Sequence, residues 1–378
     1  MNLVARLQSL TEKSLELLDE LVGADVPRLY YHPQGQLAPL IDALPRLKNK
    51  YRPTPWLANT HAHLIYFDKI RKRTVQLNYD RVDQLTMSDG GITGIAWYGL
   101  DLPAHVPTIL VLHTITGSTN SMRELVKDLH QYTGWRIALC LRRGHAGLPL
   151  SVPKINLFGD TQDLREQIQY IQQHFPQSTL YAVGSSAGTG LLVRYLGEEG
   201  KQTPIQAAFA LCPGYNTETG FSYVHPVYSR MMAKKLVQHF IQPYANVWQS
   251  NPAIDKVLQA KDLAEFEQAY FELAGYHDYV SYCQATNPIY VFEQISIPLM
   301  ILNAEDDPVC NITNLGPYKK VIQRMPNMVV VTTKKGSHCG FYEGVRPTKS
   351  WAHQLMAEFF QLQSEQVTSH PLSKSCIN

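Results

Sequence analysis

One stretch of the chain, residues 181–199, limits the possible folds more than any other part of the sequence. The apolar run Leu180–Val183 predicts a buried strand, and the residues after Gly188 repeat apolar side chains with the period of a helix. Between them lies Gly-Ser-Ser-Ala-Gly, in which very small residues flank Ser186. Strand, turn and helix in this order predict a tight, strained turn that holds the Ser186 hydroxyl at the N-terminus of the helix. A Gly/Ser-rich loop before an ordinary helix is the less favoured interpretation, because both flanking elements are present.

Composition excludes several broad classes of protein. A chain of 378 residues, 44% of them hydrophobic, is long enough for one large α/β domain or two smaller ones. The net charge of +2 does not favour a nucleic-acid partner. The six cysteines are scattered without paired spacing, which indicates reduced, packed thiols. No apolar run approaches the roughly 18 residues of a membrane span, and the N-terminus lacks a signal peptide's apolar segment. We therefore expect a soluble, cytoplasmic protein.

The sequence divides into an N-terminal arm, a main domain and a tail. Residues 1–22 place leucines on one helical stripe, and the polar face of this predicted helix is more acidic than basic. Docking of this helix on the protein's own body or on a second subunit is favoured over peripheral membrane contact, since lipid-binding helices are usually basic. We expect this helix and an irregular arm over residues 1–50, the main domain over 51–365, and a polar tail over 366–378.

Apolar runs through the main domain predict a mostly parallel sheet with helices on both faces. These runs are Thr108–Leu112, Arg136–Leu141, Ala207–Leu211, Pro298–Leu302 and Met328–Thr332. Residues 73–100 alternate well enough for a hairpin that precedes them. The strand rhythm stops over about 213–288, a segment with helical patterning that is rich in tyrosine and too long for a simple connection. We interpret it as a cap whose apolar residues would wall a substrate pocket, and a purely structural insertion is the alternative.

Three side chains of complementary chemistry each follow a predicted strand. Ser186 comes first, an acidic pair at Asp306 and Asp307 second, and His338 third. Serine, acid and histidine in this order are typical of α/β-hydrolases, whose ligands bind at the carboxyl ends of the strands. His338 would take the Ser186 proton as general base, and a carboxylate would orient the imidazole. We favour Asp307 for that role, because it directly precedes a proline, and expect Asp306 to cap the turn.

The loop after the strand at 108–112 predicts part of an oxyanion hole. One donor would be the backbone N–H of Ala187, and the other, by position, that of Ile115. His113 beside it is expected to orient this loop rather than to act as a base.

Other polar residues are given structural interpretations. Arg142 and Arg143 could suggest a phosphate site, but pairing with acids such as Asp160 or Asp163 is favoured. His61 and His63 have the spacing of metal ligands, yet no nearby Cys or Asp completes a site. No metal and no cofactor are predicted.

Several longer motifs resemble the α/β-hydrolase subfamily called AB hydrolase 4, which includes bacterial YheT-like and eukaryotic ABHD1/ABHD3-type proteins. They span about residues 51–342 and include Trp-Leu-Ala-Asn-Thr-His at 56–61, Arg-Gly-His-Ala-Gly at 143–147, Phe-Gly-Asp-Thr-Gln-Asp-Leu at 158–164, Tyr-Ala-Val-Gly-Ser-Ser at 181–186, Tyr-Leu-Gly-Glu-Glu-Gly at 195–200 and Ala-Glu-Asp-Asp-Pro at 304–308. The resemblance implies an α/β-hydrolase fold and serine hydrolysis of acyl esters, in some members of phospholipids or acylglycerols. The chain departs from the family in Thr114, where glycine is usual, and in the small residues on both sides of Ser186.

These observations together predict a serine carboxylesterase or lipase-like hydrolase (EC 3.1.1) that acts on a small-molecule ester or lipid. One alternative is a non-catalytic lipid- or partner-binding protein that keeps the fold, which the altered Thr114 loop motivates. Another is an acyltransferase, which shares the acyl-enzyme and differs in whether the pocket excludes water.

Overall fold

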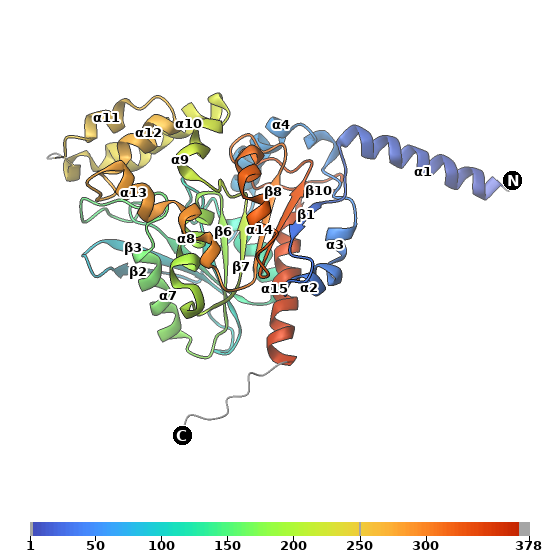
Figure 1. The fold of residues 1–378 in the computed structure, drawn as a ribbon, viewed down its shortest axis with the longest axis horizontal. Helices are drawn as coiled ribbons and strands as arrows, with labels where there is room; N and C mark the ends of the chain where they lie inside the picture. The colour runs from blue at the N-terminus through green and yellow to red at the C-terminus, as the bar shows by residue number, and fades with distance from the viewer. Residues whose placement is uncertain (1–2, 249–250, 370–378) are drawn as a thin grey trace, which may run out of the picture.

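A nine-stranded sheet forms the centre of the computed structural model, which describes residues 3–248 and 251–369 (Figure 1). Its order is β1-β9-β8-β7-β6-β4-β5-β3-β2, and the six central strands from β9 to β5 are parallel. The strands are β1 (Arg28–Tyr31), β2 (Arg81–Thr86), β3 (Ile92–Tyr98), β4 (Thr108–Leu112), β5 (Arg136–Leu141), β6 (Leu180–Ser185), β7 (Ile205–Leu211), β8 (Leu299–Ala304) and β9 (Met328–Thr333). The predicted α/β class is thereby confirmed.

Helices cover both faces of this sheet because its central strands are apolar on both sides. Every residue of β4, β5, β6, β8 and β9 is buried. One face packs against α6 (Arg123–Thr133) and α15 (Trp351–Ser369), and the other against α7 (Gln162–His174) and α8 (Ala187–Glu199). The predicted hairpin is β2–β3, which extends the sheet beyond β5 in antiparallel fashion.

The N-terminal arm is part of the main body, contrary to the expectation of a separate, irregular segment. β1 pairs antiparallel with β9 and forms one edge of the sheet. The leucines of α2 (Ala38–Ala43) and α3 (Pro45–Lys48), together with Leu44 between them, are buried in the same core as α6 and α15. The sequence boundary at residue 50 was therefore wrong, because apolar burial continues across it.

The first helix, α1 (Leu3–Val22), projects away from the body (Figure 1). Its C-terminal end is anchored through Asp19, which accepts hydrogen bonds from Arg52 at 2.7 Å and Lys50 at 3.0 Å. Leu17 and Leu21 on its apolar stripe are 67% and 82% exposed. These two residues therefore do not dock on the protein's own body, and docking of α1 on a second subunit stays a prediction. No helix in the described part of the chain is both long and apolar enough to cross a membrane.

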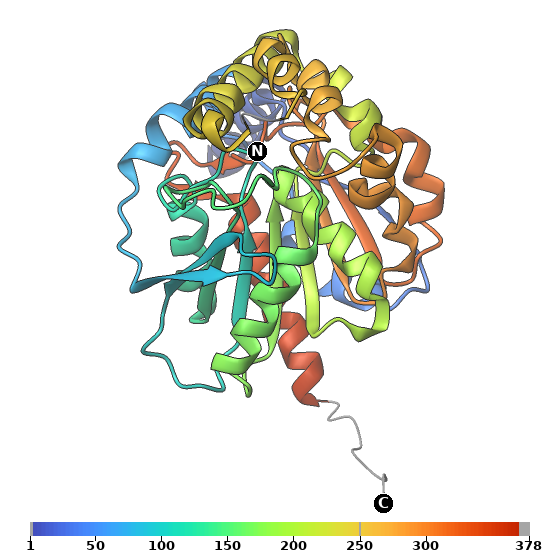
Figure 2. The ribbon, with the colours of Figure 1, turned by 90° about the vertical axis from the view of Figure 1, so that its left-hand side faces the viewer.

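A helical cap lies over the carboxyl ends of the parallel strands (Figure 2). Its helices are α9 (Thr217–Gly220), α10 (Pro226–Leu236), α11 (Ile254–Gln259), α12 (Leu263–Tyr270) and α13 (Tyr279–Thr286). The cap has its own core, which includes the buried Trp248 and Phe266.

Short elements complete the fold. They include the short helices α4 (Thr60–Ile65), α5 (Lys72–Thr74) and α14 (Lys319–Ile322) and the β10–β11 pair (Tyr342–Glu343 and Lys349–Ser350). They also include the 3₁₀ segments η7 (Pro288–Tyr290), η8 (Phe292–Gln294) and η9 (Ile312–Tyr318). The helix α15 continues to Ser369, into the predicted polar tail, and residues 370–378 of that tail lie outside the described residues.

Candidate active site

Ser186 occupies a strained turn between β6 and α8. Its φ of +52° lies in the left-handed region that non-glycine residues rarely adopt. Close packing explains the glycines on either side. A Cβ on Gly184 would lie 2.6 Å from the Gly188 carbonyl oxygen, and one on Gly188 would lie 2.2 Å from that of Leu112. Only glycine fits at both positions, so the turn is fixed and the Ser186 side chain stands at the start of α8.

The structure brings Ser186, His338 and Asp307 together, although they follow three different strands. Nε2 of His338 lies 2.9 Å from Oγ of Ser186, and its Nδ1 lies 2.8 Å from Oδ2 of Asp307. All three side chains are largely buried. The other carboxylate oxygen of Asp307 accepts the backbone N–H groups of Val309 at 2.7 Å and Cys310 at 2.9 Å. The carboxylate is thus held with one oxygen directed at the imidazole.

The charge of Asp307 sets the proton affinity of His338. Burial of the ring opposes its positive charge, but the negative charge and hydrogen bond of Asp307, together with the nearby Cys339 and Cys310, outweigh this effect and raise the pKa of His338 above its usual range. A raised pKa makes the neutral imidazole a stronger base towards the Ser186 hydroxyl.

Asp306 does not contact His338. Its Oδ1 accepts the backbone N–H of Ser337 at 2.9 Å, and Lys335 lies 3.8 Å from its other oxygen. Burial raises the pKa of Asp306 to about 6. Asp306 therefore supports the loop that carries His338 rather than capping its own turn, where Asp307 accepts the backbone N–H groups.

Two backbone amides are available beside Ser186. Ala187 and Ile115 line the same cavity as Ser186. Among the described residues, neither N–H donates to another backbone group outside the regular helices and strands. Because Ala187 is the first residue of α8, its N–H also has no partner within the helix. Both residues predicted as oxyanion donors thus line the cavity that holds Ser186, and no hydrogen bond is described for their backbone N–H groups.

The loop that carries Ile115 is held by a buried arginine, a feature that sequence reasoning missed. Arg142 donates to the backbone carbonyls of Leu157 at 2.7 Å, His113 at 2.9 Å and Thr114 at 2.6 Å. Burial lowers the pKa of Arg142 to about 9. The predicted pairing with an acid is correct only for Arg143, which bonds Asp163 and Asp89, whereas Arg142 bonds backbone oxygens instead. An Arg-Arg pair in the sequence gives no signal of this difference.

Two histidines complete the support of this loop. Nδ1 of His113 lies 2.8 Å from the Thr114 oxygen, and Nε2 of His145 lies 2.9 Å from the Ile115 oxygen. Burial lowers the pKa of His145 to about 3, so it is neutral at physiological pH. The structure agrees with an orienting role for His113, which makes no contact with Ser186 among the described hydrogen bonds.

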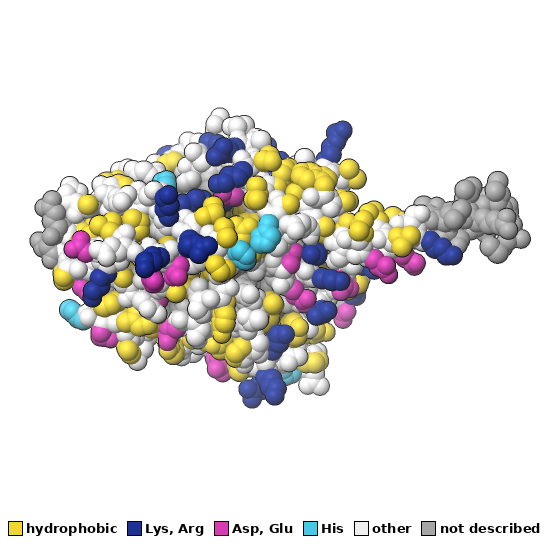
Figure 3. All heavy atoms as spheres, turned by 90° about the horizontal axis from the view of Figure 1, so that it is seen from above, with side chains coloured by type: hydrophobic (Ala, Val, Ile, Leu, Met, Phe, Trp, Pro, Cys, Tyr) yellow, Lys and Arg dark blue, Asp and Glu magenta, His cyan; other side chains and the backbone are white. Residues whose placement is uncertain are grey.

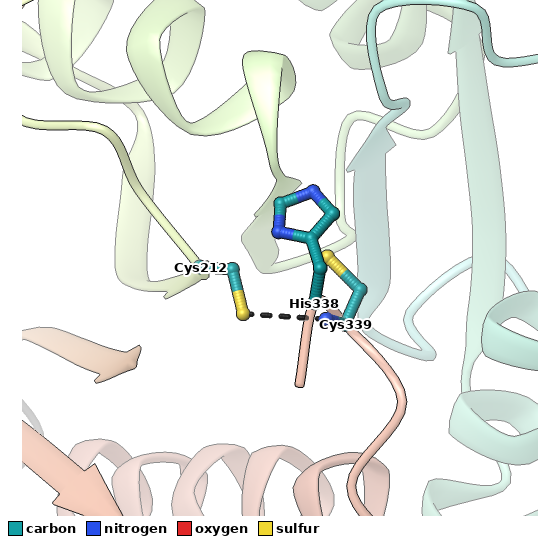
Figure 4. A group of neighbouring side chains, drawn as sticks. All are labelled: Cys212, His338 and Cys339. Atoms are coloured by element: carbon teal, nitrogen blue, oxygen red, sulfur yellow. Dashed lines mark hydrogen bonds between the residues drawn. The ribbon is translucent and has the colours of Figure 1, made fainter. Parts of the chain in front are cut away.

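A cysteine pair lies beneath His338 (Figure 4). The backbone N–H of Cys339 donates to Sγ of Cys212 at 3.3 Å, and ligand atoms of these two residues and His338 lie within 4.8 Å of one another. Both ring nitrogens of His338 are already hydrogen-bonded, so the imidazole has no spare lone pair for a metal.

His61 and His63, which have the spacing of metal ligands in the sequence, lie in different surroundings. His63 is buried and its Nδ1 lies near the Leu57 carbonyl, whereas His61 is exposed and bonds Tyr228.

Comparison with known proteins agrees with this geometry. A family model described as "alpha/beta hydrolase fold" matches residues 107–345. The chain is 27% identical over 347 residues to phospholipase ABHD3 of Bos taurus, covering 88% of this chain and 83% of the relative. It is 26% identical over 284 residues to medium-chain fatty acid ethyl ester synthase/esterase 2 of Saccharomyces cerevisiae, covering 68% and 62%. A solved structure from Staphylococcus aureus, of unknown function, shares the fold with a TM-score of 0.52 at 12% identity, covering 76% of this chain and 99% of that one.

Proposed function

Because this chain belongs to the family with the alpha/beta hydrolase fold, we propose that it is a serine hydrolase that cleaves carboxylic esters through an acyl-enzyme. The observation that carries the proposal is the continuous hydrogen-bonded path from Ser186 through His338 to Asp307. A nucleophile, a base within reach and a group that orients the base are the three parts this chemistry needs. An intact path of this kind also favours catalysis over the non-catalytic binding alternative.

In the first half-reaction, Oγ of Ser186 attacks the acyl carbonyl carbon while Nε2 of His338 takes the hydroxyl proton. Asp307 holds Nδ1–H of the imidazole and stabilises its positive charge. The N–H groups of Ala187 and Ile115 receive the negative oxygen that develops. As the intermediate collapses, the ester C–O bond breaks and His338 returns its proton to the leaving alcohol. Water, deprotonated by His338, then attacks the acyl-enzyme, and the carboxylic acid leaves with Ser186 restored.

We further propose that the ester is a lipid. The names of the bovine and yeast relatives, a phospholipase and a fatty acid ethyl ester synthase/esterase, support this class. The cavity beside Ser186 supports it as well, since Ile115, Phe158, Val224 and Leu263 give its upper walls apolar surfaces.

A lipid substrate would favour peripheral contact with a membrane. Exposed apolar side chains gather over α4 and the base of α1, among them Ile65, Leu17 and Leu21 (Figure 3). We propose this face as the contact. Replacing Leu17 and Leu21 together by serine should reduce co-sedimentation with phosphatidylcholine vesicles and leave hydrolysis of a soluble ester unaffected. Undiminished vesicle binding by the double variant would contradict the contact.

The test of the proposed reaction is labelling of the purified protein with a fluorophosphonate probe. We expect Ser186→Ala to abolish labelling and to lower kcat for p-nitrophenyl esters by roughly 10⁴-fold or more, as loss of the nucleophile does in such enzymes. Ser185→Ala is the matched control, because it removes the neighbouring hydroxyl and should keep labelling. Labelling that persists in Ser186→Ala would rule out Ser186 as the nucleophile, and an unlabelled wild-type protein would favour the binding-protein alternative.

Acyl transfer to an alcohol remains the second candidate, favoured by the ester synthase activity in the name of the yeast relative. Both reactions share the acyl-enzyme, so they differ only in what attacks it. Adding ethanol to an ester hydrolysis assay and measuring the ratio of ethyl ester to free acid separates them. A ratio well above that set by the alcohol's share of the solvent would indicate a transferase.

A further inference from the structure

The cavity beside Ser186 does not end below the cap but continues into the core of the main body. Its wall follows one face of α8 through Gly190 and Val193 and includes Leu299 and Ile301 of β8 on the opposite side. Met328, the first residue of β9, also lines it. Asp307 follows the carboxyl end of β8, whereas Leu299 begins that strand. The cavity therefore runs along the whole length of β8, away from the reacting groups.

The length of this lower part follows from strand geometry. A strand of six residues such as β8 spans about 16 Å at roughly 3.3 Å per residue. With C–C bonds of about 1.5 Å in a zigzag, an extended chain of roughly twelve carbons covers that distance.

The walls of the lower cavity suit a hydrocarbon. Leu299, Ile301, Met328, Ile322 and Val193 are apolar. Several polar residues that line the cavity use their side-chain atoms in hydrogen bonds within the protein. Thr189 donates to the Ser186 carbonyl, Tyr215 to Asn303, and Asn314 to the carbonyls of Gly214 and Asn216. A ligand here meets no unpaired donor among these side chains, and apolar cavities of this kind take up apolar ligands.

The glycine at position 190 of α8 indicates that the lower cavity is a feature of the sequence and not an accident of loose packing. A glycine inside a helix costs about 1 kcal/mol relative to alanine, and two other glycines of α8 have a steric reason. A Cβ would lie 2.2 Å from the Leu112 oxygen at Gly188 and 2.3 Å from the Val291 oxygen at Gly197. At Gly190 a Cβ would meet nothing within 4 Å. Neither packing nor helix geometry requires glycine at this position, and its effect is to leave the cavity open one turn beyond Ser186.

We propose that this lower cavity, lined by Gly190, Val193, Leu299, Ile301, Ile322 and Met328 and here called the acyl tunnel, binds the straight acyl chain of the substrate, and that Gly190 is the residue that admits long chains. The inference rests on the proposed ester hydrolysis and adds to it a class of substrate, esters of linear fatty acids with up to roughly twelve carbons inside the tunnel. The acyl carbonyl then sits at Ser186, and the alcohol part lies on the side of the cap.

The test measures kcat/KM for p-nitrophenyl butyrate and dodecanoate and takes the ratio of the two. In Gly190→Leu the new side chain fills the tunnel, so we expect the ratio of dodecanoate to butyrate to fall by about 100-fold, within the range that hydrophobic pockets discriminate. Val193→Phe blocks the tunnel about 4.5 Å deeper, three residues further along α8. Its cutoff should therefore come at a chain a few carbons longer. The control is Gly316→Leu, an exposed position outside the cavity where a Cβ also meets nothing within 4 Å, and its ratio should equal that of the wild type.

A second measurement separates this inference from the proposed reaction. In a Ser186→Ala background, calorimetry with dodecanoate reports tunnel binding without catalysis, and we expect Gly190→Leu to weaken it by about tenfold or more. If Gly190→Leu weakens dodecanoate binding but the wild-type protein hydrolyses no ester, the result supports the acyl tunnel and contradicts the proposed reaction. An unchanged chain-length ratio and unchanged dodecanoate binding in a folded Gly190→Leu protein would overturn the tunnel, and Gly190→Ala, which adds one methyl group, provides the smaller change if leucine prevents folding.

Discussion

At the scale of single residues, two adjacent carboxylates have opposite surroundings. Asp307 accepts two backbone N–H groups and faces His338, whereas Asp306 accepts one and faces Lys335. Since their side chains are identical, the difference comes entirely from the turn after β8. The choice of Asp307 could be made from sequence only because a proline follows it, and the distances supply the physical reason.

Replacing Asp307 by asparagine should lower kcat by about 10³–10⁴-fold, as loss of the orienting carboxylate does in related sites. His338 must be neutral to accept a proton, and Asp307 raises its pKa. Without that charge the pKa falls, so the acidic limb of the kcat/KM profile should move to lower pH. Asp306→Asn is the control: its amide oxygen can still accept the Ser337 N–H, and we expect a much smaller loss of kcat. Equal losses in both variants would contradict the assignment.

At the scale of elements, the loop after β4 depends on a side chain from the loop after β5. Arg142 donates to three loop carbonyls, and two of them, those of His113 and Thr114, directly precede Ile115 in the chain. Thr114 is not among the described residues with a positive φ, so its backbone conformation is open to threonine, and Arg142 holds its carbonyl. The geometry of the Ile115 N–H is thus set outside its own loop.

Removing this guanidinium should disturb both stability and turnover. Arg142→Met removes the donor to the His113 and Leu157 carbonyls, whereas the Thr114 carbonyl still accepts the Gly117 N–H. Two buried acceptors without a partner should cost about 2–5 kcal/mol in the free energy of unfolding. We expect kcat to fall by about tenfold or more with little change in KM, because a displaced oxyanion donor affects mainly the transition state. Arg165→Met, which breaks only partly exposed pairs with Glu198 and Glu199, should change neither quantity much. Urea unfolding and steady-state kinetics on both variants decide the matter.

The sequence predicted the central strands and the three residues that the structure brings together, but not the side chains that hold the surrounding loops in place. Thr108–Leu112 and Arg136–Leu141 were predicted with the bounds they have, because continuous apolar runs report buried strands directly. Ser186, Asp307 and His338 could be found because their order and local patterns are informative. Arg142 could not, since its partners are backbone oxygens that have no signature in a sequence.

At the scale of the whole molecule, the N-terminal arm closes one edge of the sheet. Leu44 lies between α2 and α3 and is fully buried in the core shared with α15. The strand β1 escaped prediction because its four residues, Arg-Leu-Tyr-Tyr, show no clear alternation and pair with residues about 300 positions further along the chain. Only the tertiary pairing makes this segment a strand.

This boundary leads to a paired prediction about stability. Leu44→Ala creates a cavity in the core and should lower the free energy of unfolding of the whole protein by about 2–5 kcal/mol. Leu17→Ala makes the same substitution on the exposed face of α1 and should change it by less than about 0.5 kcal/mol. Thermal unfolding followed by circular dichroism compares the two, and equal shifts would mean that the arm does not share the core.

The pairing of β1 with β9 also has a consequence for how the protein is made. A ribosome releases the N-terminal strand first, at about 5–20 residues per second, yet its partner emerges only after residue 328. Throughout that interval the nascent chain carries an unpaired strand and the apolar leucines of the arm, the kind of exposed edge that invites aggregation. Translation that stops before β9 therefore leaves β1 without its partner and a chain without His338, so unfinished copies would be prone to aggregate and, on the proposed mechanism, inactive.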